Sequence, residues 1–193
     1  MDEVDANDNP TGKRVTTSDY ASANYYYVNK SSLPKVYGGF NTSLSWKGFD
    51  LSAIFAYSIG GYIYNRDITM ILHNGSLEGR DWSTEILRRW TPENRYTDVP
   101  ALSTTSNNWN SASTRFLQNN SYMRLKNLTL SYNLPKQLIS KLALSSVQVF
   151  VQGDNLFTIH RNQGLDPEQG ITGITYYRYP AMRTISGGIN LSF

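Results

Sequence analysis

Apolar side chains recur at every second residue through long runs of this sequence, with small polar side chains between them. Two such runs flank Lys47 and Gly48, and their apolar members are Phe40, Thr42, Leu44, Trp46, Phe49, Leu51, Ala53, Phe55, Tyr57 and Ile59. A period of two places successive side chains on opposite faces of a β-strand. The pattern therefore predicts a hairpin over residues 34–60 with one apolar face and one polar face.

The length of these runs constrains the fold further. Each is about ten residues long, whereas strands of globular proteins usually have about 5–6 residues. A tilted strand needs ~9–11 residues to cross a lipid bilayer, which is the length found here. The hairpin is therefore expected to span a membrane.

Three further strands are predicted in residues 119–193. The first covers roughly Ser121–Leu134, and its alternation changes phase near Lys126 and Asn127, which indicates a β-bulge. The second covers about Ser145–Thr158, with valines on one face and glutamines on the other. The last runs from about Tyr179 to the end of the sequence. Together with the hairpin, they make about five alternating segments, fewer than the eight strands of the smallest outer-membrane barrels.

The connections alternate between short and very long. Residues 1–33 and 61–118 read as long loops, while Lys47-Gly48 and the residues after Pro135 form short turns. Outer-membrane barrels combine short turns at one end with long extracellular loops at the other. The pattern favours an all-β, antiparallel transmembrane β-barrel whose polar face lines the lumen or contacts a plug. Residues predicted on that inward face are Asn41, Ser43, Ser45, Ser52, Gln148 and Gln152.

One short helix is expected within the loop 61–118. Asp81 can cap its N-terminus, and Trp82, Ile86 and Trp90 share a face at helical spacing. Pro92 marks its end. A second helical turn is expected over residues 135–142, with Pro135 as its first residue.

Composition and charge exclude several classes of protein. The chain has 193 residues, of which 39% are hydrophobic, so it is not disordered throughout. Its 18 basic and 15 acidic residues are scattered, which argues against a nucleic-acid-binding surface. The absence of cysteine excludes a disulfide scaffold and thiolate metal sites. No run reaches the ~18 apolar residues of a transmembrane helix, and residues 1–15 do not form a signal peptide.

Five segments, in this order, resemble one protein family. They are KVYGGFNTSLSWKGFDLSAIFAYSIGGYIYN, RRWTPENRYTDVPAL, SYMRLKNLTLSYNLPKQLISKL, VFVQGDNLFTIHRNQGLDPEQG and YPAMRTISGGINLSF. Residues 34–193 thus resemble the C-terminal end of SusC/RagA-type TonB-dependent outer-membrane transporters. Each segment alone is only a weak sign of this family, but all five in the family's order are a specific one.

The resemblance implies a plugged barrel of about 22 strands, of which this chain supplies about the last five. It implies import of glycan or peptide fragments across the Gram-negative outer membrane, with a SusD-like surface lipoprotein and the inner-membrane TonB complex. The signal sequence, plug and TonB-contacting segment are expected upstream, in a longer protein or a gene of which this is a truncated piece. Ile189, Leu191 and Phe193 resemble the signal read by the barrel-assembly machinery, and Phe193 is also expected to face lipid.

No catalytic constellation is evident, so neither enzymatic activity nor a cofactor is predicted. His73 and His160 lie in expected loops and are interpreted as solvated residues. Asp166 and Glu168 lie two residues apart, but in this family the segment is a structural loop whose turn is shaped by Pro167.

The N-terminal segment carries part of a calcium-loop pattern. Asp5, Asn7 and Asn9 match its opening, but Pro10 replaces the glycine and Thr16 stands where a bidentate glutamate belongs. No metal site is therefore predicted, although calcium binding by the first three residues stays open.

Aromatic residues of the expected loops are candidates for contact with substrate or with the lipoprotein lid. Their alternative role is in an aromatic girdle or in loop packing. These candidates are Tyr25, Tyr26, Tyr27, Trp82, Trp90, Trp109, Tyr176 and Tyr177.

Two competing hypotheses remain at this stage. A soluble β-sandwich that binds carbohydrate would bury its apolar strand faces against a second sheet. A complete small porin would need at least eight strands, more than the alternation supports.

Overall fold

The computed structural model describes residues 2–7, 9–75, 77, 79–103, 105, 108–140, 144–164, 166–168 and 170–193. It divides into two compact units. The sheet unit comprises Ser31–Ile63, Gln118–Gly173 and Arg178–Phe193, and the loop unit comprises Met1–Lys30, Tyr64–Leu117 and Ile174–Tyr177.

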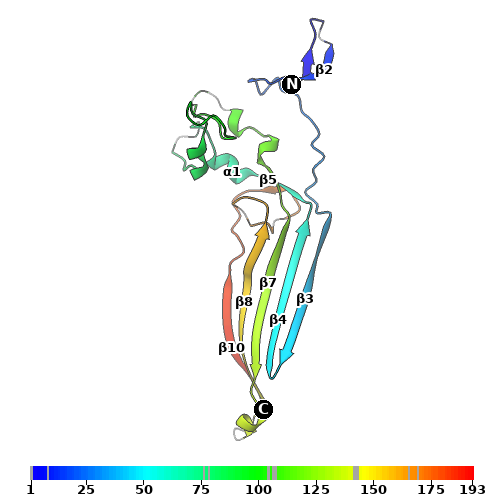
Figure 1. Ribbon diagram of the computed structural model, residues 1–193, viewed down its shortest axis with the longest axis vertical. Helices are drawn as coiled ribbons and strands as arrows, with labels where there is room; N and C mark the ends of the chain where they lie inside the picture. The colour runs from blue at the N-terminus through cyan, green and yellow to red at the C-terminus, as the bar shows by residue number, and fades with distance from the viewer. Residues whose placement is uncertain are drawn as a thin grey trace. The chain divides into compact units, whose positions relative to one another are not determined.

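The sheet unit is built on five long antiparallel strands that lie side by side in one layer (Figure 1). Their spatial order is β10-β8-β7-β4-β3. Their bounds are β3 (Val36–Trp46), β4 (Phe49–Ile59), β7 (Tyr122–Asn133), β8 (Ser146–His160) and β10 (Thr184–Ser192). The strands lie where the alternation predicts them, and four of the five have 11 to 15 residues.

The β3–β4 hairpin closes through a tight two-residue turn. Lys47 and Gly48 both have positive φ angles, 47° and 89°, as the turns that fit twisted hairpins require. A side chain at position 48 would come within 3.1 Å of the Asn133 carbonyl oxygen, so glycine fits best there. The predicted bulge is also confirmed, because the register of β7 against both neighbours skips Lys126.

The last strand begins later than its alternation predicts, at Thr184 rather than near Tyr179. The preceding backbone is engaged elsewhere. The Ala181 N–H donates to the Asp166 carboxylate over 2.6 Å, and the Met182 carbonyl accepts from the Asn155 amide over 3.1 Å. Both backbone groups are therefore bonded to side chains and not to the backbone of β8.

The two faces of the sheet differ as predicted. One row across the apolar face joins Leu44, Leu51, Leu130 and Val151, while the adjacent row on the opposite face joins Ser43, Ser52, Thr129, Gln152 and Ser186. Leu44 is 67% exposed and Ile189 is 63% exposed. Phe55 stacks on Phe40 within the same face, with ring centroids 4.7 Å apart.

The exposed apolar face contradicts the soluble-sandwich hypothesis. Within the described part of the sheet unit, no second layer covers it. A face that carries this many exposed leucine, isoleucine, valine and aromatic side chains is suited to a hydrocarbon environment.

The loop unit contains short elements. Residues 1–33 were predicted to be a continuous loop, but β1 (Asp2–Val4) and β2 (Pro10–Arg14) pair in a small hairpin. Asp5 stabilises its turn by accepting the backbone N–H groups of Asn7 and Asn9. The remaining elements are α1 (Arg66–Ile71), η1 (Thr84–Arg88), η2 (Asn108–Asn110), η3 (Thr114–Phe116) and β9 (Ile174–Thr175).

Three other short elements complete the list, namely β5 (Tyr62–Asn65), β6 (Leu117–Asn119) and α2 (Lys136–Ile139). Tyr64 and Asn65 pair in parallel with β9. Pro135 occupies the N-cap position of α2 and not its first helical turn, and the rest of that expected turn, Lys141 and Leu142, lies outside the described residues.

The helix predicted near residues 81–90 is a 3₁₀ helix of five residues, η1. Its N-cap is Ser83, whose hydroxyl accepts the Glu85 N–H, and not Asp81. Other segments engage its flanks, because the Ser83 N–H donates to the Ile71 carbonyl and the Trp90 N–H to the Val99 carbonyl. Because these backbone groups are bonded to other segments, the helix does not extend beyond η1 in either direction.

No helix among the described residues is long and apolar enough to cross a bilayer.

Candidate functional site

The polar face of the sheet carries side-chain hydrogen bonds that link neighbouring strands. The Asn133 amide donates to Asp50 over 2.7 Å, and the Asn127 amide donates to Asp154 over 2.8 Å. Further along, Gln148 accepts from Asn190 over 3.1 Å. The residues predicted to face inward all lie on this face, which is therefore a hydrogen-bonding surface along the length of the strands.

A buried arginine lies on the polar face, near the end of the sheet from which the long loops leave. Arg124 pairs in register with Ala56 on β4 and Thr158 on β8. Its Nε donates to the Thr158 hydroxyl over 2.9 Å, and its side chain is only 4% exposed. A buried guanidinium requires acceptors for its remaining N–H groups.

A segment of the following loop supplies those acceptors. We call its described residues 162–164, 166–168 and 170–173 the strap. Arg124 donates to Asp166 over 2.6 Å and to Glu168 over 2.7 Å, and Lys126 lies 2.7 Å from the same Glu168. Two cations from the bulged part of β7 therefore hold the strap against the polar face.

The Asp166 carboxylate is bonded to two backbone N–H groups as well as to Arg124. Burial alone would raise the pKa of Asp166, but the N–H groups of Glu168 and Ala181 and the Arg124 guanidinium outweigh burial and hold the pKa below its ordinary value. The side chain is 7% exposed, so the carboxylate is both buried and charged. The expectation that this segment has a structural role agrees with these contacts.

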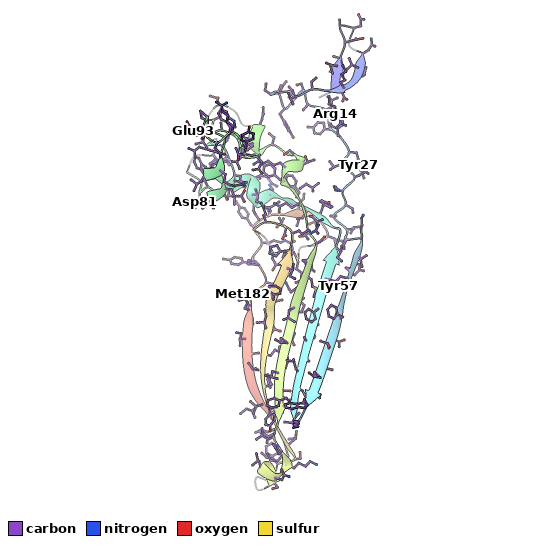
Figure 2. All side chains as sticks on the ribbon, in the orientation of Figure 1. Arg14, Tyr27, Tyr57, Asp81, Glu93 and Met182 are labelled. Carbon is purple, nitrogen blue, oxygen red and sulfur yellow. The ribbon has the colours of Figure 1, made fainter. Side chains whose placement is uncertain are left out.

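Beside this ion cluster, the strap covers a cavity of about 340 Å³. From the polar face it is lined by Tyr37, Ala56, Ser58 and Tyr122, and from the strap by Pro167, Gly170, Ile171 and Gly173. Its other lining residues are Ser32, Pro34, Gly38, Tyr57, Gly61, Tyr62, Ile63 and Asn120. Tyr57 lies near the loop end of β4 (Figure 2).

The structure does not gather the eight predicted loop aromatics into one place, although all belong to the loop unit. Tyr25 and Tyr27 are each 90% exposed on an extended segment, where Figure 2 marks Tyr27. The Arg14 guanidinium lies over the ring of Tyr26, 3.9 Å from its centroid, and the Tyr26 hydroxyl donates a hydrogen bond to the Asp2 carboxylate. Tyr25 and Tyr26 also line a second cavity of about 460 Å³.

The remaining aromatics make local contacts. The Tyr176 and Tyr177 rings lie 4.0 Å apart, and Arg66 lies over Tyr176. Trp109 packs against the Arg115 guanidinium at 3.9 Å. Trp90 is 43% exposed. Contact of any of the eight with substrate or lid stays a prediction.

His73 is not a solvated loop residue as predicted, because it is 1% exposed. Its Nδ1 accepts the Trp82 indole N–H over 3.0 Å and the Gly75 N–H over 3.3 Å. Burial lowers the pKa of His73 by more than a hydrogen bond with the Arg80 backbone raises it. His160, in contrast, is exposed at the end of β8, and its Nδ1 lies 2.9 Å from the Asn162 carbonyl.

Acidification is expected to loosen the segment around His73. In the unfolded chain its pKa is about 6.5, so below that pH the unfolded state binds the proton first and stability falls as the pH drops towards the lower folded pKa. Protonation also removes the acceptor for Trp82. The hydrogen-exchange protection factors of residues 66–75 and 79–90, which are corrected for the pH dependence of intrinsic exchange, should fall as the pH drops from about 7 to 5. His73→Phe should abolish this pH dependence, and an unchanged pH profile in that variant would contradict the assignment.

The partial calcium pattern does not form a cluster of acidic ligands. Among the described residues, no group of three or more histidine, cysteine or acidic side chains is placed to hold a metal. The Asp5 carboxylate instead accepts the N–H groups of Asn9 and Asn7, which hold its pKa below the ordinary value.

Sequence reasoning missed the ion cluster and the tyrosine-lined cavity. One signal for the cluster was available, because Arg124 and Lys126 are the only side chains of β7 charged at neutral pH and stand in a strand expected to cross a membrane. Their partners lie 42 to 44 residues away, in a loop without periodicity.

Comparison with known proteins agrees with this architecture, although no family model matches the chain. TonB-dependent receptor P3 of Formosa agariphila is 34% identical over 166 residues, which cover 80% of this chain and 16% of that protein. TonB-dependent receptor SusC of Bacteroides thetaiotaomicron is 30% identical over 170 residues, covering 86% of this chain and 16% of SusC.

Solved structures of the RagAB peptide importer are also similar. Its closed-closed state superposes with a TM-score of 0.81 at 36% identity, covering 99% of this chain and 20% of the matched chain. The open-open state gives the same TM-score and identity over 93% of this chain. The chain thus spans a sixth to a fifth of the length of these relatives (16% of P3 and SusC, 20% of the RagAB chain).

A single antiparallel layer with an exposed apolar face and a hydrogen-bonded polar face, similar throughout to a solved importer, is a segment of an outer-membrane β-barrel. The chain belongs to the SusC/RagA-type TonB-dependent receptors and forms a C-terminal segment of their barrel.

Proposed function

We propose that this segment serves the import of nutrient fragments, either glycans or peptides, across the outer membrane in a TonB-dependent receptor. The observation that carries the proposal is the long polar face, bonded from strand to strand and opposite an apolar face that stays exposed. Such a wall separates lipid from a water-filled path. The names of the relatives, a peptide importer and receptors of the SusC type, agree with this role.

The partners belong to the same proposal. A SusD-like surface lipoprotein would cover the extracellular loops, and the TonB complex would act through parts of the receptor outside this chain. Ile189, Leu191 and Phe193 would form the signal for the barrel-assembly machinery. Two features support this last role, since Ile189 and Leu191 lie on the exposed apolar side of β10 and Phe193 is 91% exposed.

An uptake experiment tests the function. Fluorescent oligosaccharides or fluorescent oligopeptides are given to two strains. One strain expresses the receptor that carries this segment, and the other lacks the gene for that receptor. We expect uptake of one class only in cells with the receptor, and loss of that uptake when a protonophore removes the energy supply of TonB. Equal uptake of both classes in the deleted strain would overturn the proposal.

A further inference from the structure

The tyrosine-lined cavity beneath the strap has the geometry of a slot. Tyr37, Ser58 and Tyr122 lie in one row of the sheet, on the neighbouring strands β3, β4 and β7. Adjacent strands are ~4.8 Å apart, so the two tyrosines are separated by about 10 Å with the small Ser58 between them. Ala56, which also lines the cavity, lies in the next row on the same face. We call Tyr37, Ala56, Ser58 and Tyr122 the tyrosine slot.

The strap covers the slot only in part, since Tyr37 stays 77% exposed. Pro167 and Ile171 line the cavity from the strap, and Pro167 is buried. The Pro167 carbonyl accepts from Asn120 over 2.8 Å, and the Ile171 carbonyl accepts from Ser32 over 2.9 Å. The Arg124 pairs lie on either side of Pro167 in the sequence, so the cover is fixed from both edges.

The chemistry of the cavity favours an uncharged ligand. None of the described residues that line it is ionised at neutral pH. Arg124 and Lys126, which hold the strap, are already paired with Asp166 and Glu168. The Arg178 guanidinium lies against Gly170 of the strap but does not line the cavity. A carboxylate or phosphate placed here would lose its water without gaining a partner of opposite charge among the lining side chains, which is costly.

The tyrosines favour a ring with apolar faces and a hydroxyl rim. Within the part of the chain that the structure describes, the hydroxyls of Tyr37 and Tyr122 make no hydrogen bond, so both can bond a ligand. A purely apolar side chain would cover these hydroxyls without satisfying them. Aromatic rings on both sides of a narrow gap suit a flat partner, and the volume of about 340 Å³ is at the lower end of the range for small-molecule sites.

We propose that the tyrosine slot is a subsite for one neutral sugar ring of an oligosaccharide, with the rings of Tyr37 and Tyr122 against its faces. This inference rests on the proposed import function and narrows it to neutral glycans at this site. Arg124 acts as a positioning residue, because it holds the strap over the slot without contacting the ligand.

The test measures binding by the purified receptor that carries this segment. The probes are a panel of neutral hexasaccharides (of glucose, mannose, xylose and galactose units), a galacturonate hexasaccharide and an uncharged capped hexapeptide. We expect a neutral hexasaccharide to bind most tightly. Tyr37→Ala and Tyr122→Ala should each weaken its affinity about tenfold, because each removes one ring from the stack. Tyr37→Phe should weaken the affinity less than Tyr37→Ala, because the ring stays and only the hydroxyl's bond to the ligand is lost.

Two further variants complete the design. Ser58→Leu should weaken binding by a similar factor, because its side chain occupies the gap. Tyr179→Ala is the matched control, since Tyr179 is 97% exposed and does not line the cavity, and it should bind as the natural protein does. The shift in electrophoretic mobility on heating verifies that each variant is folded.

The outcomes separate the two proposals. Tightest binding of galacturonate or peptide would overturn the neutral-sugar subsite, and so would unaltered affinity in all slot variants, while import itself stood. Failure to bind any probe, combined with failure of the uptake experiment, would overturn the proposed function and the subsite together.

Discussion

Replacing Arg124 with methionine is expected to lower the free energy of unfolding by about 3–5 kcal/mol. The side chain is 4% exposed and bonds Thr158, Asp166 and Glu168, so its loss leaves the buried Asp166 carboxylate without its cation. The strap should detach from the polar face, because its charged contacts to β7 are reduced to Lys126. Equilibrium urea unfolding of the receptor in lipid vesicles measures the change.

Two comparisons identify the cause of that loss. Arg183→Met is the matched control, because Arg183 is exposed and makes no ion pair among the described residues, and it should change stability by less than about 0.5 kcal/mol. Adding Asp166→Asn to the Arg124→Met variant removes the carboxylate left without a cation, while Glu168 keeps its pair with Lys126, and should restore most of the lost stability. A loss below about 1 kcal/mol in Arg124→Met would contradict a stabilising role for the cluster.

The strands could be predicted from the sequence because their signal is local. Odd-numbered and even-numbered residues of a strand lie on opposite faces, and this alternation alone places the exposed Leu44 and Ile189 on the apolar face. The bulge at Lys126 was equally visible, because inserting one residue shifts the parity on one side. These features need no knowledge of distant contacts.

The loops could not be predicted in the same way. Trp82, Ile86 and Trp90 have helical spacing, but Trp82 bonds His73 and Trp90 bonds Val99, and these contacts replace the expected helix with a 3₁₀ helix of five residues. The burial of His73 has no periodic signature either. Arg124 meets carboxylates more than 40 residues away, and a strand pattern cannot show such a pairing.

Val151→Arg is expected to lower the free energy of unfolding in a bilayer by about 2–4 kcal/mol. Val151 lies on the apolar face near the middle of β8 and is 47% exposed, in register with Leu130 and Gly187. A charge there must leave water for hydrocarbon. Unfolding of the receptor in lipid vesicles by urea gives the free-energy difference from the natural protein.

The adjacent residue supplies the control, since Gln152 has nearly the same depth but lies on the polar face. Gln152→Arg places the charge beside Asp154, which Gln152 already contacts, and should cost less than about 1 kcal/mol. If both faces met water, the two arginines would be tolerated equally. A large difference in the free energy of unfolding between Val151→Arg and Gln152→Arg would therefore show which face meets lipid. Equal effects would contradict the orientation of the sheet, and the proposed import path and the tyrosine slot both depend on that orientation.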